Sequence, residues 1–212
     1  MTLRMERYLD QAARWPEEGR HILAHHDDET IVVYQAYRPS IAGYAVRHGA
    51  FGGDFSFSRM SWIKPNFLWM MYRSGWGSKP DQEATLGLRL RRGFFESLLA
   101  QAVASTFGAS GYADMKSWKH AVARSDVRLQ WDPDHGPGGE PLKRRAIQLG
   151  LRGDTLAAFG GPELLEVIDM TPFVAEQRAR LTAGGVRDLE TPRETVFLPS
   201  DAALRARLGL AA

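Results

Sequence analysis

The segment from Arg59 to Lys79, RMSWIKPNFLWMMYRSGWGSK, combines the side-chain types that a bound nucleotide requires. Its acid-free sequence contains three tryptophans and four cations: Trp62, Trp69, Trp76, Arg59, Lys64, Arg73 and Lys79. Guanidinium and ammonium groups bind phosphate, and aromatic rings stack on bases. Core packing accounts for the apolar run within the segment but leaves the flanking cations unexplained. We therefore expect a phosphate-bearing ligand here.

The charge distribution along the chain points to the same region. The formal net charge is only +2, but residues 59–152 carry 15 basic and 8 acidic side chains between two acidic ends. This middle part also contains five of the six tryptophans. Excess positive charge favours phosphate binding. A solvated basic face is the alternative interpretation.

Two predicted units have to position these side chains. The sequence TIVVYQAY (30–37) is rich in β-branched and aromatic residues, which predicts a buried strand. A short helix over 40–46 should follow, with Gly49 as its stop. Pro65 and Gly75 suit the two ends of a second helix, which is apolar nearly all round and should therefore be buried.

The rest of the pattern predicts an α+β fold in one domain, residues 1–212, with a central mixed or antiparallel sheet flanked by helices. Further strands are expected over 84–91, 127–131, 146–151 and 164–168, and further helices over 93–103, 112–123 and 171–181. Residues 1–29 should form a helix and a turn, and residues 185–212 should wrap the domain. The stretch 132–139 has the glycine and proline content of an exposed loop, with Asp134 and His135 solvated.

Composition excludes several classes of protein. The chain has no cysteine, which excludes disulfides, thiolate catalysis and cysteine-ligated metals. No apolar run approaches the length of a membrane span, so we expect a cytoplasmic protein without a membrane partner. The glycine-rich dinucleotide, P-loop, hydrolase-elbow and zincin motifs are absent. His25 and His26 precede three acidic residues, but a polar turn explains this cluster better than a metal site, and we expect no metal.

Several of these stretches resemble an uncharacterised bacterial family, domain-of-unknown-function family 4291. They are VYQAY (33–37), RMSWIKPNFLWMMYRSGW (59–76), KPDQE (79–83), LQWDP (129–133), RAIQLGL (145–151) and the closing TPRETVFLP (191–199). The resemblance covers most of the chain from about residue 30 onward. It implies no particular activity, because the family carries no established function.

A weaker resemblance, of pattern only, is to the ADP-ribosyltransferase fold. Those enzymes begin with a strand that carries a polar NAD contact and continue at once into a short helix, as TIVVYQAYRPSIAGYAVRHG does here. The resemblance implies NAD as substrate and transfer of ADP-ribose to a nucleic acid or protein acceptor.

Under this hypothesis each candidate side chain has a role that the chemistry of NAD cleavage demands. Breaking the glycosidic bond develops positive charge on the ribose, so a carboxylate or an amide must stabilise it. Glu83 is the first candidate, and Gln148 is its substitute. Arg73 and Lys64 should bind the phosphates, assisted by the neighbouring Arg59 and Lys79. The candidates for the aromatic wall are Tyr34, Tyr37 and Trp76, and Trp69 is a further aromatic candidate for cofactor binding. Gln35 is the candidate for a contact to nicotinamide or ribose.

The alternative is a module that binds RNA or DNA, or a nuclease-like protein. In that case the central cations follow the phosphates of a strand and the tryptophans stack on its bases. Each side chain also has a structural alternative: Glu83 with Lys79 could form an ion pair on a turn, and Gln148 could satisfy a buried backbone group.

Overall fold

The two units predicted around the tryptophan-rich segment are present in the structure, a computed structural model that describes residues 3–210. Strand β4 spans Thr30–Tyr37 and helix α2 spans Pro39–His48, ending at Gly49 with a left-handed φ of 64°. Helix α3 spans Phe67–Ser74. The Asn66 side chain caps its start by accepting a 2.7 Å hydrogen bond from the Trp69 backbone N–H.

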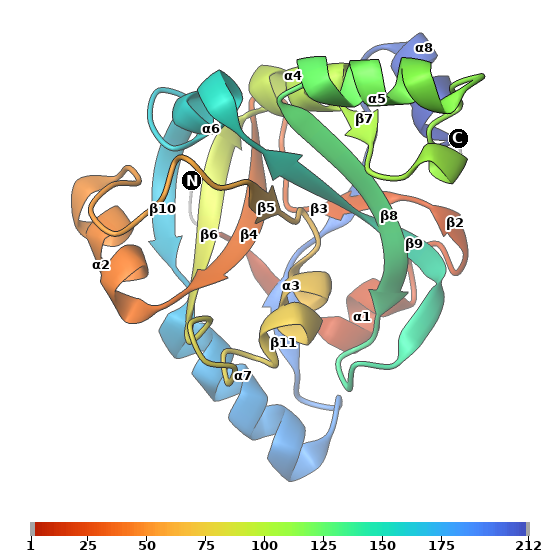
Figure 1. Ribbon diagram of the computed structural model, residues 1–212. Helices are drawn as coiled ribbons and strands as arrows, with labels where there is room; N and C mark the ends of the chain where they lie inside the picture. Colours follow the sequence, from red (N-terminus) through yellow and green to blue (C-terminus); the bar gives the residue numbers. More distant parts are fainter. Residues whose placement is uncertain (1–2, 211–212) are drawn as a thin grey trace.

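The strands form two main sheets (Figure 1). The first is antiparallel, in the order β10 (Leu164–Asp169), β6 (Ala84–Arg91) and β4. The second is mixed, in the order β2 (Gly19–Arg20), β9 (Pro141–Leu151), β8 (Val127–His135) and β7 (Val103–Ala104), and β5 (Ser61–Ile63) also pairs with β9. The predicted α+β class with mixed and antiparallel strands in one domain is confirmed.

One bridge between the sheets fixes the position of the central segment. Tyr34 on β4 donates a 2.7 Å backbone hydrogen bond to Lys64, just after β5, and receives one of 3.3 Å in return. Because β5 belongs to the second sheet, this pair of hydrogen bonds joins the two sheets. Beyond it, residues 35–37 of β4 face the start of β5.

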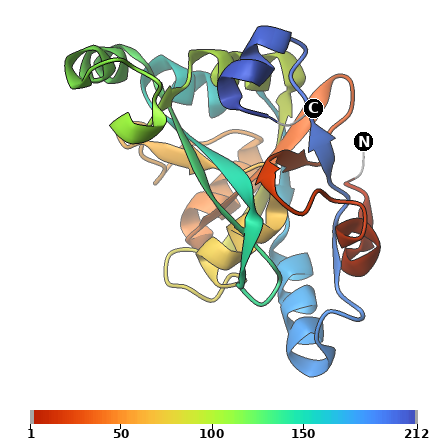
Figure 2. The same ribbon diagram turned by 90° about the vertical axis from the view of Figure 1, so that its right-hand side faces the viewer.

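The remaining helices cover the ends and faces of the sheets (Figures 1 and 2). Helices α4, α5 and α8 lie at one end, and α7 lies at the other. Their bounds, with the other short helices, are α1 (Tyr8–Ala12), α4 (Arg92–Gln101), η1 (Phe107–Ala109), α5 (Met115–Arg124), α6 (Gly153–Phe159), α7 (Thr171–Gly184) and α8 (Ala202–Leu208). Leu86, Leu88 and Leu90 of β6 are fully buried between these layers.

The two ends of the chain pair with each other. Strand β1 (Met5–Arg7) is antiparallel to β11 (Glu190–Pro192), and β3 (Ile22–Ala24) is antiparallel to β12 (Thr195–Phe197). The expectation of a helix and a turn over residues 1–29 is therefore incomplete, because the described part of this segment contains β1, the short α1, β2 and β3. The C-terminal segment lies along the N-terminal one and carries the buried Glu194, which accepts a 2.7 Å hydrogen bond from the Phe67 N–H at the start of α3.

The stretch 132–139 is not the exposed loop that its composition predicts. Strand β8 continues through it to His135, with a register shift after Pro133. Asp134 and His135 are buried: Asp134 forms a 2.7 Å ion pair with Arg144, and the His135 ring stacks on Tyr72 with centroids 3.5 Å apart. The expectation of solvated turn residues is therefore wrong, because tertiary contacts override the local turn signal.

Within residues 3–210, no helix is both long and apolar enough to cross a membrane.

Candidate functional site

A pocket of about 440 Å³ opens at the junction of the two sheets. Its walls come from β4, β5, α3 and β9, from the segments on either side of β5 and from the segment before β6. It is lined by Gln35, Ala36, Tyr37, Arg59, Met60, Ser61, Trp62, Lys64, Met70, Arg73, Gln82 and Gln148. Its volume is typical of small-ligand sites.

Six side chains that the sequence singled out meet in this pocket: Gln35, Tyr37, Arg59, Lys64, Arg73 and Gln148. They come from distant parts of the chain. The strand β4, the tryptophan-rich segment and the late strand β9 each contribute. The fold thus brings together most of the residues proposed to bind the ligand.

Three of these residues are cations without a protein partner. Across residues 3–210, the side chains of Arg59, Lys64 and Arg73 make no hydrogen bond and no ion pair. Arg59 and Arg73 are exposed, whereas Lys64 is only 4% exposed. None of the residues that line the pocket is acidic. The lining of the pocket therefore carries three positive charges and no acidic residue.

Other arginines of the basic middle region are engaged elsewhere. Arg89 pairs with Glu166 at 2.8 Å, and Arg92 pairs with Glu96 at 3.0 Å. Arg152 donates to the carbonyl of Ala123 at 2.8 Å and to other carbonyls nearby. These arginines therefore differ from Arg59, Lys64 and Arg73, whose side chains have no such partners among the described residues.

Burial changes the acidity of Lys64. Together with the nearby Arg73, and against the opposing effect of Asp132, it lowers the pKa of the ammonium group to about 8. The ammonium also lies 5.9 Å from the centre of the Trp69 ring. A lysine in this state exchanges its proton near physiological pH.

The opposite wall of the pocket is a chain of polar groups. The Gln35 amide donates to the Ser61 hydroxyl at 2.7 Å and to the Trp62 carbonyl at 3.1 Å, and the Tyr37 and Ser61 hydroxyls are hydrogen-bonded at 3.0 Å. The Gln35 carbonyl oxygen is buried and has no partner among the described residues. Burying an acceptor in this state is unfavourable unless an ordered water or a ligand supplies a donor.

Sequence reasoning missed Asp132, the carboxylate behind this pocket. Its two oxygens accept 2.7 Å hydrogen bonds from the amides of Gln130 and Gln148. Gln130 and Gln148 are direct cross-strand partners on β8 and β9. The alternation of Gln130 and Asp132 along one strand face was the available signal, but Pro133 directly after Asp132 suggested a turn.

Four predicted residues lie outside the pocket lining. Tyr34 is fully buried on the other face of β4, 5.3 Å from Phe67 between ring centroids. Trp69 is buried in a stack with His135. The Trp76 indole donates to the Pro137 carbonyl at 3.0 Å, and the Lys79 ammonium donates to the Arg73 carbonyl at 2.8 Å. Trp62 is the tryptophan that lines the pocket.

Glu83 also lies apart from these cations. It lines a different pocket, of about 400 Å³, together with Arg47 and Asp169. Its carboxylate accepts a 3.0 Å hydrogen bond from the Asp81 backbone N–H. The expected convergence of Glu83 with Tyr37, Lys64 and Arg73 on one pocket does not occur.

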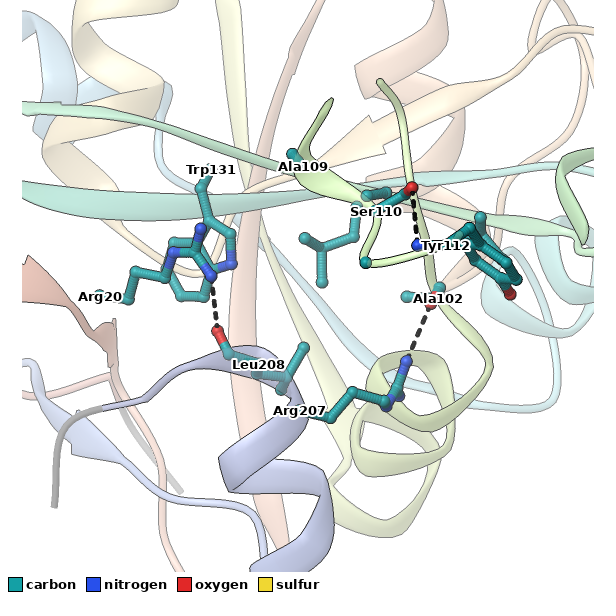
Figure 3. Close-up of a pocket in the computed structure, with 12 residues that line it drawn as sticks. Arg20, Ala102, Ala109, Ser110, Tyr112, Trp131, Arg207 and Leu208 are labelled. Carbon is teal, nitrogen blue, oxygen red and sulfur yellow. Dashed lines mark hydrogen bonds between the residues drawn. The ribbon is translucent and has the colours of Figure 1, made fainter. Parts of the chain in front are cut away.

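A further pocket, of about 410 Å³, lies between β8 and α8 (Figure 3). Arg20 stands over Trp131 there, 5.8 Å from its ring centre, and donates to the Leu208 carbonyl at 3.3 Å. Arg207 donates to the carbonyls of Leu99 and Ala100, each at 2.7 Å. Both guanidinium groups bind backbone carbonyls, so this pocket differs from the one with three unpartnered cations.

The described residues, 3–210, contain no group of three or more histidine and carboxylate side chains arranged to hold a metal ion.

The family comparison agrees with the motifs from which the site was built. The model of a domain-of-unknown-function family, DUF4291, matches residues 21–197. The chain belongs to this family. The matched range includes every residue that lines the pocket with the unpartnered cations. No match is found among curated proteins.

Proposed function

We propose that the pocket binds the phosphates of a nucleotide, with NAD as the ligand and transfer of its ADP-ribose as the reaction. The observation that carries this proposal is the convergence of Arg59, Lys64 and Arg73, whose side chains make no hydrogen bond or ion pair within residues 3–210. Charge-assisted hydrogen bonds to phosphate are among the strongest that a protein makes. A pyrophosphate would supply the counter-charge that the pocket lining lacks.

The other walls of the pocket suit the rest of a nucleotide. Trp62 and Tyr37 line the pocket and offer aromatic surface to a base or to nicotinamide. In this proposal Gln148, held by Asp132, takes the place next to the ribose that the sequence suggested for Glu83. Its amide oxygen would stabilise the positive charge that develops as the glycosidic bond breaks.

Thermal denaturation in the presence of NAD tests binding. At a concentration about a hundred times the dissociation constant, NAD should raise the melting temperature by roughly 5–10 °C. Arg73→Gln should remove most of this shift, whereas Arg124→Gln, on the exposed face of α5, should leave it unchanged. The reaction itself is tested by incubating the protein with NAD and measuring the release of free nicotinamide by chromatography. No shift with NAD at millimolar concentration would contradict the proposal.

A second candidate function, binding of RNA or DNA, is favoured by helix α5. This helix has no buried residue and carries three cationic side chains on its outward face, Lys116, Lys119 and Arg124. It lies at the periphery of the molecule (Figure 2). Lysine and arginine on an exposed helix attract the phosphates of a nucleic acid.

Fluorescence anisotropy with a labelled oligonucleotide tests this second function. Affinity should fall steeply as salt rises, and the Lys116→Glu and Lys119→Glu double variant should reduce the slope of log K against log salt by about 2. The matched control is Arg187→Glu, an exposed charge reversal near α7. Binding that is absent at low salt, or equal in both variants, would exclude α5 as a nucleic-acid surface.

A further inference from the structure

Lys64 has properties that binding of phosphate alone does not require. It is the one lysine of the five in the sequence that is buried, since Lys79, Lys116, Lys119 and Lys143 are all exposed. Two guanidinium groups, those of Arg59 and Arg73, already line the same pocket, and a guanidinium suits phosphate better than an ammonium does. A third, buried ammonium is therefore available for another task.

The surroundings of Lys64 are those of a reactive amine. Enzymes activate a lysine as a nucleophile by removing it from water and by placing a second cation near it. Both conditions hold here: Lys64 is 4% exposed, and Arg73 lies close enough on α3 to disfavour its charge. Asp132 on β8 acts in the opposite direction but is already hydrogen-bonded by two glutamine amides. The remaining charged group among the residues that line the pocket is Arg59.

We propose that Lys64 forms an imine with the aldehyde of a phosphorylated aldose whose phosphate is held by Arg59 and Arg73. The lone pair of Nζ attacks the aldehyde carbon, and a C–N bond forms while the C=O bond opens. The oxygen then leaves as water with both hydrogens of the amine, and a C=N bond remains. Ribose 5-phosphate and the ring-opened terminal ribose of ADP-ribose belong to this class of substrate.

This proposal rests on the phosphate-binding part of the proposed function but not on NAD. The phosphate brings the sugar to the pocket, and the neutral amine does the chemistry. The same pocket would thus accept free sugar phosphates. Ser61 and Gln148 offer hydrogen bonds to their hydroxyl groups.

Reductive trapping tests the proposal. The wild-type protein is incubated at pH 8 with ribose 5-phosphate and sodium cyanoborohydride, which reduces an imine to a stable secondary amine. Peptide mass spectrometry then compares the five lysines in one sample. Lys64 should be modified at least tenfold faster than any exposed lysine, and at least tenfold faster with ribose 5-phosphate than with ribose.

Two variants separate a reactive amine from a merely accessible one. Arg73→Gln should reduce the preference for ribose 5-phosphate over ribose, and it should move the pH at which trapping is half-maximal upward because a neighbouring cation is lost. Asp132→Asn should move this pH downward. Modification of Lys64 at the same rate as the exposed lysines would overturn the proposal. A preserved thermal shift with NAD in that sample would leave the proposed function standing.

Discussion

At the scale of single residues, the central feature is a buried cation that the fold does not neutralise. A charged group in the interior is unfavourable unless it is paired, and a hydrophobic side chain of similar size would be more stable in the place of Lys64. Strongly perturbed groups of this kind concentrate at functional sites. Lys64 shares its pocket with two further cations that lack partners, so its position favours a binding role.

Replacement of Lys64 by methionine should therefore stabilise the ligand-free protein. Because the pKa of Lys64 is lowered to about 8 by burial, Lys64→Met should raise the free energy of unfolding at pH 7 by about 3 kcal/mol. Between pH 8 and about 10.5 the unfolded chain binds a proton that the folded protein does not, so wild-type stability rises and the difference disappears. Urea denaturation across this pH range measures it, with Lys79→Met as the control. A destabilised Lys64→Met variant at pH 7 would refute this account.

The buried ion pair of Asp134 and Arg144 gives an opposite prediction. Arg144 also donates to the Pro16 carbonyl at 2.5 Å, so the pair joins the β8–β9 hairpin to the N-terminal segment. Asp134→Asn leaves a buried guanidinium without its counter-ion and should destabilise the protein by about 3–5 kcal/mol. Glu163→Gln, which removes a partly exposed 3.6 Å pair with Arg91, should cost less than about 1 kcal/mol. Urea denaturation measures both losses of stability. Equal losses for Asp134→Asn and Glu163→Gln would contradict the argument that burial makes the first ion pair more important.

At the scale of elements, α3 holds Arg73 in place through its two ends. Asn66 caps the start, and Gly75 ends the helix with a φ of 59°. The next residue, Trp76, also has a positive φ, 56°, which is uncommon for a bulky side chain. Its indole hydrogen bond to Pro137 and the 3.3 Å hydrogen bond from Arg178 to its carbonyl hold this conformation. Backbone held in this way is common beside functional sites.

Gly75→Ala should destabilise the protein by about 1–2 kcal/mol, because alanine is disfavoured at a left-handed φ. A Cβ there would also lie 2.9 Å from the Ser78 hydroxyl. Gly93→Ala is the matched control. Gly93 lies in the first turn of α4, and its Cβ would meet no atom within 4 Å, so this change should stabilise by roughly 0.5 kcal/mol. Thermal denaturation measures both variants. A change in stability of the same sign in both would contradict the left-handed backbone conformation at Gly75.

Local sequence signals predicted the helices and strands better than they predicted the contacts between them. The strand 30–37 and the helix after Pro65 were predictable from β-branched content, proline and glycine. The end of β8 was not, because Asp132 and Pro133 form a turn signal that only pairing with β9 overrides. Tyr34 and Gln35 were both proposed as ligand contacts, but side chains alternate along a strand. Because Gln35 lines the pocket, its neighbour Tyr34 points to the opposite face of the strand and lies in the core.

At the scale of the whole molecule, the site exists because two sheets meet. The backbone bridge between Tyr34 and Lys64 joins them, and the pocket lies where β4 and β5 continue beyond it. The tryptophan-rich segment and Gln148 were predictable as candidates from their residue types. Their convergence, the separate position of Glu83 and the part played by Asp132 depend on long-range strand pairing, which no local pattern encodes.

The most direct test of this account is a calorimetric titration of the protein with NAD and with inorganic pyrophosphate. We expect the wild-type protein to bind both, and the Arg59→Gln and Arg73→Gln double variant to bind NAD at least a hundredfold more weakly. Lys79→Gln should bind as the wild type does, because Lys79 lies outside the pocket lining. Absence of binding to the wild-type protein, or equal affinity in the double variant, would contradict the assignment of this pocket as a phosphate site.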